Sequence, residues 1–139
     1  MSRHPLTATL LVAVAAGGAV GAVLRWGLDE LAPDGTGFPW TTFAINVSGS
    51  FLLALLPALP AVRRHAVVAV GLGPGVLGGY TTLSTYSEQT RALMAGGATV
   101  LAGTYLLGTL AACLVAVHLA TVFSTPAEQH EFEDEEGNE

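Results

Sequence analysis

Four long apolar segments follow one another along the chain, from about residues 6–24, 40–59, 66–94 and 98–123. The first, second and fourth contain no Asp, Glu, Lys or Arg, and the third carries Glu88 and Arg91 towards its end. A helix rises about 1.5 Å per residue, so the first segment spans about 28 Å, which is enough to cross the hydrocarbon core of a bilayer. The pattern predicts an all-α integral membrane protein with four transmembrane helices.

The first segment allows a second interpretation. Arg3 followed by an apolar stretch is typical of a signal peptide, with the small residues near Ala15 as its cleavage site. The apolar run continues past them to Leu24 and three further spans follow, which favours a retained first helix. Inside it, Gly17 and Gly21 form a small-xxx-small pair that predicts close packing against another helix.

The third segment is too rich in glycine to form one uniform helix. Pro74 lies among Gly71, Gly73, Gly75, Gly78 and Gly79. Glycine and proline free backbone carbonyls, so this cluster predicts a helix that is broken near the middle of the membrane. Close packing is the alternative role for Gly78 and Gly79, but Thr81 and Thr82 directly after them favour the break.

Hydroxyl side chains are concentrated after the predicted break, in the run GGYTTLSTY over residues 78–86. Hydrocarbon penalises unsatisfied polar groups, so such a run is stable only where protein or a water-filled path surrounds it. It therefore predicts the lining of a conduit.

Two polar stripes accompany this run at a spacing of four residues, which places each stripe on one helix face. The second segment carries Thr42, Asn46 and Ser50, and the fourth carries Tyr105, Thr109 and Cys113. Either stripe alone could serve only to hydrogen-bond neighbouring helices. Together with a broken, threonine-rich helix, they favour a narrow path of neutral donors that suits a small, strongly hydrated anion.

Composition agrees with a lipid environment, since 51% of residues are hydrophobic, 12% are charged and the mean hydropathy is +0.55. The net charge of −6 arises from the C-terminus, where seven of the eleven acids follow Pro126. We expect a transmembrane channel domain over residues 1–124 and a disordered acidic tail over residues 125–139. With five arginines and no lysine the chain has no basic tract, which argues against nucleic acid as a partner.

No pattern of residues indicates catalysis. Asp29, Glu30 and Asp34 lie together without a metal-ligand or nucleophile motif, and we expect them to cap or solvate the first loop. The histidines are scattered, and His118 is interpreted as interfacial, with a ligand role as the alternative. Cys113, the single cysteine, is expected to pack in apolar surroundings. An enzyme is therefore the weaker class.

Three stretches carry a resemblance to a known family: GGAVGAVLRW at 17–26, TFAINVSGSF at 42–51 and GGYTTLSTYSE at 78–88. In combination they resemble the Fluc/CrcB family of bacterial fluoride channels. The resemblance implies passive fluoride export across the inner (plasma) membrane by an antiparallel, dual-topology dimer with two pores. It also implies a central sodium ion held by the carbonyls of Gly78 and Thr81, and places Arg25 near the aqueous vestibule.

We place the fluoride pathway along residues from three of the four segments. They are Asn46, Ser50, Thr82, Leu83, Ser84, Thr85, Tyr86, Tyr105 and Thr109. Asn46 matches the pore-associated asparagine of the family.

The chain departs from the family pattern at two places. Leu83 and Tyr86 stand where the family has phenylalanines whose positive ring edges contact the anion, and leucine has no such edge. Gln89 stands where an acid usually lies, while Glu88 precedes it by one residue.

These departures keep two alternatives open. The chain is either self-sufficient or the partner of a paralogous chain in a heteromeric fluoride channel. A small dual-topology cation transporter is the other class, and it would require Glu88 at the centre of a cavity.

Overall fold

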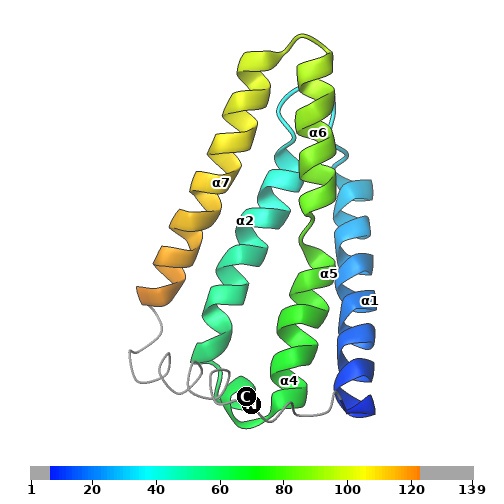
Figure 1. Cartoon of the computed structure of the whole chain (residues 1–139), viewed down its shortest axis with the longest axis vertical. Coiled ribbons are helices and arrows are strands. Elements are labelled where there is room, and N and C mark those ends of the chain that lie inside the picture. The colour runs from blue at the N-terminus through cyan, green and yellow to red at the C-terminus, as the bar shows by residue number, and fades with distance from the viewer. Residues whose placement is uncertain (1–6, 123–139) are drawn as a thin grey trace.

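The computed structural model describes residues 7–122, so the predicted acidic tail at 125–139 lies outside the described residues. Four stretches in this part of the chain are long and apolar enough to cross a membrane: Ala8–Leu31, Trp40–Ala58, Ala66–Ala95 and Thr99–Val122. Every element formed by the described residues is helical, which confirms the predicted all-α membrane fold (Figure 1). In order these elements are α1 (Ala8–Leu31), α2 (Trp40–Leu55), η1 (Leu56–Ala58), α3 (Pro60–Arg64), α4 (Ala66–Val70), η2 (Gly71–Leu77), α5 (Gly78–Tyr80), α6 (Leu83–Ala95) and α7 (Thr99–Val122).

Helix α1 continues two turns beyond the apolar segment that predicted it. Arg25 and Asp29 lie in these turns and form an i,i+4 ion pair, with Nη1 and Oδ2 4.0 Å apart. Pairing at this spacing keeps charged residues within the helix. Asp29 and Glu30 therefore belong to α1, and the first loop is shorter than the sequence indicated.

The third span is broken, as predicted. Its first half passes from α4 into the π-helix η2, which contains Pro74, and then into the single turn α5. Thr81 and Thr82 then have extended ψ angles of 159° and 110° before α6 begins. The backbone thus leaves the helical path for two residues where glycines and threonines meet.

Glycines allow α1 to pack directly on this first half. A Cβ atom at Gly21 would lie 2.0 Å from the carbonyl oxygen of Val76, and one at Gly17 would lie 2.2 Å from that of Gly71. The predicted close packing of this pair is confirmed. Gly79 approaches α1 equally closely from the other side, since its Cβ would lie 2.3 Å from the Gly18 oxygen. Gly79 therefore has the close-packing role, while it lies in the helical turn α5 and the break itself falls at Thr81 and Thr82.

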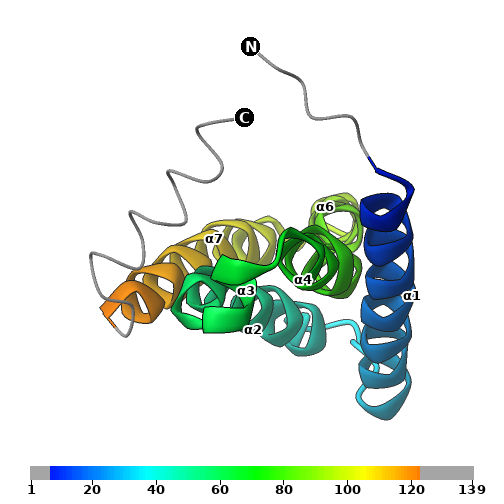
Figure 2. The ribbon, with the colours of Figure 1, turned by 90° about the horizontal axis from the view of Figure 1, so that it is seen from below.

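The remaining spans form a second group. Helix α2 packs along α7, and Figure 2 shows α4 lying between α1 and this pair. Large apolar side chains such as Leu107, Leu114 and Val115 point outwards, which suits contact with lipid. Polar side chains are instead collected between α2, the helix break and α7.

Candidate functional site

A cavity of about 620 Å³ lies between α2, the broken third span and α7. The polar residues that line it include Asn46, Ser50, Thr82, Tyr86 and Thr109. The rest of the lining is apolar apart from Thr81 and Cys113, and no charged side chain is among the residues that line it. Uncharged donors in a poorly solvated space can replace part of the hydration shell of an anion.

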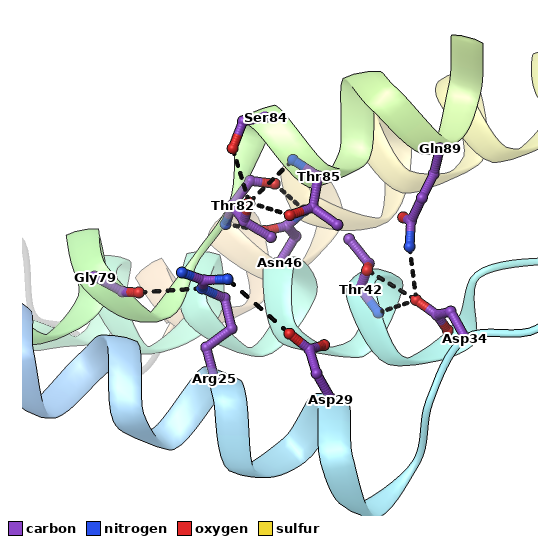
Figure 3. A network of polar contacts seen from close by, with 10 residues as sticks. All are labelled: Arg25, Asp29, Asp34, Thr42, Asn46, Gly79, Thr82, Ser84, Thr85 and Gln89. Carbon is purple, nitrogen blue, oxygen red and sulfur yellow. Dashed lines mark hydrogen bonds and ion pairs between the residues drawn. The ribbon is translucent and has the colours of Figure 1, made fainter. Parts of the chain in front are cut away.

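Asn46 fastens the helix break to α2. Its Oδ1 atom accepts a hydrogen bond of 2.9 Å from the Thr82 N–H, and its Nδ2 atom donates one of 3.1 Å to the Thr82 carbonyl. Thr82 is buried, with 8% of its surface exposed, so without Asn46 its backbone groups would lose these partners away from water. Figure 3 shows the amide beside the break.

The break also releases backbone carbonyls. In a continuous helix the Thr82 N–H would donate to the Gly78 carbonyl, and the Thr85 N–H to that of Thr81. Here the Thr82 N–H donates to Asn46, and the Thr85 N–H donates to Thr82 Oγ1 at 3.2 Å. Gly78 and Thr81 both line the cavity. Two oxygen atoms that lack their helical donors fit a hard cation such as sodium.

Arg25 does not line the cavity and lies behind the break. Its Nε atom donates to the Gly79 carbonyl at 3.4 Å, which is a third carbonyl near the break (Figure 3). Its side chain is 30% exposed and also pairs with Asp29. The structure thus places Arg25 at the edge of the break, with part of its side chain exposed to solvent.

Ser84 and Thr85 lie in the first turn of helix α6, which begins at Leu83. Thr82 Oγ1 accepts from the Thr85 N–H, donates to Thr85 Oγ1 at 2.9 Å and lies 3.4 Å from Ser84 Oγ. This is the geometry of a threonine N-cap. Neither residue is on the cavity wall, so their predicted place on the ion pathway remains a prediction.

The residues at the two family phenylalanine positions both line the cavity. Leu83 is 76% exposed in the single chain, so it is not a core residue. Tyr86 is half-buried, and its hydroxyl donates to the Leu106 carbonyl. This bond directs the hydroxyl towards α7, so the ring is the part of Tyr86 that remains for an anion in the cavity.

Tyr105 lies one layer behind Tyr86. It is fully buried, with 0% exposure, and its ring meets that of Tyr86 edge-on with centroids 5.2 Å apart. Its hydroxyl donates to Gln89 Oε1 at 2.8 Å. Tyr105 therefore supports the cavity wall without forming it, which the spacing of the polar stripe did not reveal.

Thr109 is the exception among the buried polar groups of residues 7–122. Its side chain is only 3% exposed, and Oγ1 is the one buried side-chain nitrogen or oxygen in that range without a hydrogen-bond partner. A buried hydroxyl without a partner costs about 1–3 kcal/mol. Thr109 lines the cavity, but Oγ1 itself has almost no exposed surface in the single chain, so a ligand reaches this hydroxyl only if neighbouring side chains move.

Sequence reasoning missed part of the site beside α2. Asp34 accepts hydrogen bonds from the Thr41 N–H at 2.8 Å and from the Thr42 N–H at 3.1 Å, which confirms a capping role. It also accepts 2.8 Å and 3.0 Å bonds from Thr42 Oγ1 and Gln89 Nε2. Thr42 thus faces Asp34 and not the cavity. Asp34 precedes α2 by six residues, a distance at which no local motif indicates a cap.

Glu88 lies away from the cavity. Its carboxylate pairs with Arg91 at 2.6 Å on the outer face of α6, and its side chain is 62% exposed. The cation transporter required this acid at the centre of a cavity, so the structure does not favour that class.

Comparison with known proteins identifies relatives over most of the chain. A family model described as CrcB-like protein, Camphor Resistance (CrcB), matches residues 12–121. The fluoride-specific ion channel FluC 2 of Nocardia farcinica is 40% identical over 120 residues, which are 84% of this chain and 86% of that protein. The fluoride-specific ion channels FluC of Shewanella amazonensis and Opitutus terrae are 43% and 42% identical, over 76% and 82% of this chain and 88% and 93% of their own lengths.

Proposed function

This chain belongs to the CrcB-like family, and from that premise we propose that it is a fluoride-selective channel of the bacterial plasma membrane. The channel lets fluoride leave the cytoplasm down its electrochemical gradient, which reduces fluoride toxicity. It carries out no chemical reaction, so we assign it to channels and not to enzymes. Relatives named fluoride-specific ion channels and the four membrane-spanning stretches support this assignment.

The neutral polar lining of the cavity is the observation that carries the proposal. Its donors are the side chains of Asn46, Ser50, Tyr86 and Thr109, and no charged side chain is among the lining residues; the buried Thr109 hydroxyl is the donor without a partner. A carboxylate in this space would repel an anion. Neutral hydroxyl and amide donors can replace lost water while leaving the ion free to move on.

We further propose that two chains of opposite orientation form the channel around one sodium ion. The carbonyls of Gly78 and Thr81 would hold it, because both helical donors are directed elsewhere and both residues line the same cavity. The sodium ion would supply a positive charge that keeps the released carbonyls together. The open side of the cavity, where Leu83 is exposed, is available for the second chain.

A heteromeric channel is the second candidate. Leu83 lies at the cavity wall without a ring edge, and a paralogous chain could supply the missing aromatic side chain. Flux that requires both chains would support this arrangement, whereas equal flux from this chain alone would exclude the requirement.

A pair of threonines on α7 tests the proposed function. Thr109→Ala removes the unpartnered hydroxyl at the cavity, whereas Thr104→Ala removes an exposed one that bonds to its own helix at Val100. Fluoride efflux from liposomes should fall in Thr109→Ala and stay unchanged in Thr104→Ala. Equal efflux from both variants and the unaltered chain would contradict the role given to the cavity.

A further inference from the structure

A chain of hydrogen bonds connects the first loop to the wall of the cavity. Asp34 receives four donors, three from Thr41 and Thr42 at the start of α2 and one from Gln89 on α6. The other end of the Gln89 amide accepts from the Tyr105 hydroxyl on α7. One carboxylate thereby joins three helices, as Figure 3 shows for the part from Asp34 to Gln89.

The geometry fixes the direction of the Gln89 amide. Asp34 Oδ2 can only accept, so the Nε2 end of the amide must face it at 3.0 Å. The Oε1 end is then left for Tyr105, 2.8 Å from its hydroxyl. Tyr105 is completely buried and Thr42 is 1% exposed, so water does not replace these partners easily.

The same chain reaches the ion pathway through an aromatic contact. The ring of Tyr105 meets that of Tyr86 at 5.2 Å and 62°, and Tyr86 lines the cavity. The ring of Tyr86 is thus held at its hydroxyl by Leu106 and at its edge by Tyr105, the aromatic side chain that it meets in the described structure. A ring edge carries partial positive charge, and its tilt determines whether that edge faces an anion.

We propose that Asp34 is a positioning residue for the ion pathway, acting through Gln89 and Tyr105 on the ring of Tyr86. This inference rests on the proposed channel function. By this proposal, a carboxylate in the loop before α2, outside the cavity, helps to orient the Tyr86 ring that contacts the anion inside the cavity.

A charge exchange between Asp34 and Gln89 tests the proposal. Asp34→Asn keeps one acceptor oxygen for the Thr41 N–H but opposes its amide to the donors of Thr42 and Gln89, so we expect fluoride efflux to fall about tenfold, equivalent to about 1.4 kcal/mol. Gln89→Glu opposes two carboxylates and should also lower efflux. In the double variant the new amide can donate to the new carboxylate, and efflux should recover above that of either single variant.

The pH profile gives a second readout that a purely structural cap would not change. Asp34 is faced by Thr41 and Thr42 from α2 and by Gln89 from α6, with Tyr105 of α7 behind Gln89. In Gln89→Glu the two carboxylates can share a proton, so efflux should rise as the pH falls. The unaltered chain and the double variant should lack this rise.

Gln89→Ala covers the case in which Asp34→Asn does not fold. It leaves all three bonds from Asp34 to α2 in place and removes only the connection to Tyr105. We expect reduced efflux from a protein that still folds, with a moderately lower thermal stability because the buried Tyr105 hydroxyl loses its partner. Glu88→Gln, on the exposed face of the same helix, is the matched control and should conduct normally.

The outcomes separate this inference from the proposed function. Full efflux from Gln89→Ala, or a double variant no better than its parents, would overturn the role of Asp34 while the channel function stands. No fluoride efflux from the unaltered chain would refute the channel function and this role together.

Discussion

Replacing Asn46 by leucine should disable conduction without preventing the protein from inserting and assembling. Leucine is similar in size but can neither donate nor accept, so both hydrogen bonds to the Thr82 backbone are lost. The loss affects the two residues that leave the helical path and the cavity wall that they form.

The magnitude follows from the burial of Thr82, which is 8% exposed. A buried N–H that loses its partner costs about 1–3 kcal/mol. If this cost falls on the conducting arrangement of the break, its population decreases by about 5- to 150-fold. We therefore expect a loss of fluoride efflux within this range.

Efflux is measured with a fluoride electrode on liposomes that contain equal amounts of each protein. Ser87→Ala is the control, since this exposed hydroxyl bonds only to its own helix at Leu83 in the described structure. Asn46→Asp retains one acceptor but opposes a carboxylate to the Thr82 carbonyl, so it should fail as well. Undiminished efflux from Asn46→Leu in a correctly assembled protein would refute the role of this amide.

Three further predictions concern packing, the aromatic position and acid stability. Gly21→Ala should destabilise the protein by about 1–3 kcal/mol because the new methyl group overpacks against Val76. Gly27→Ala is the control and should not destabilise it, since no atom lies within 4 Å of the new Cβ. The free energies of unfolding of the two variants are compared in detergent. Leu83→Phe should raise fluoride flux by adding a ring edge to the cavity wall, and a loss of both assembly and flux would show that this position is tightly packed instead. Burial acts to raise the pKa of Asp34, but hydrogen bonds from Thr41, Thr42 and Gln89 outweigh it and lower the pKa below the ordinary 3.8. The ionised Asp34 should therefore stabilise the folded protein at neutral pH, and this contribution should be lost as the pH falls through the lowered pKa. The difference in stability between the unaltered chain and Asp34→Asn should shrink in acid. A difference that does not depend on pH would contradict this prediction.

Hydropathy alone predicted much of the fold because bilayer thickness requires long apolar helices. An irregular third span was predictable for a local reason, since Pro74 and the glycines around it weaken helical hydrogen bonding. The chain stays helical through Pro74, as the π-helix η2, and breaks seven residues later at Thr81 and Thr82. The end of α1 was not predictable, because the helix continues to Leu31 through Arg25, Asp29 and Glu30, which interrupt the apolar pattern.

The site was predicted less completely because periodicity assigns residues to a face without identifying the neighbour of that face. Thr42 and Asn46 share a stripe, yet Thr42 bonds to Asp34 and Asn46 bonds to Thr82. Asp34 and Gln89 are 55 residues apart, and no local pattern joins them. Ser84 and Thr85 belong to the polar run, but their place at the start of α6 depends on where the break falls.

Release of fluoride from liposomes that contain only this chain tests the central claim most directly. The membrane potential is clamped, and fluoride and chloride are measured in parallel against empty liposomes. The account predicts rapid release of fluoride with chloride retained, since the cavity offers neutral donors suited to a small, strongly hydrated anion. Fluoride release no faster than from empty liposomes, or equal release of both anions, would contradict it.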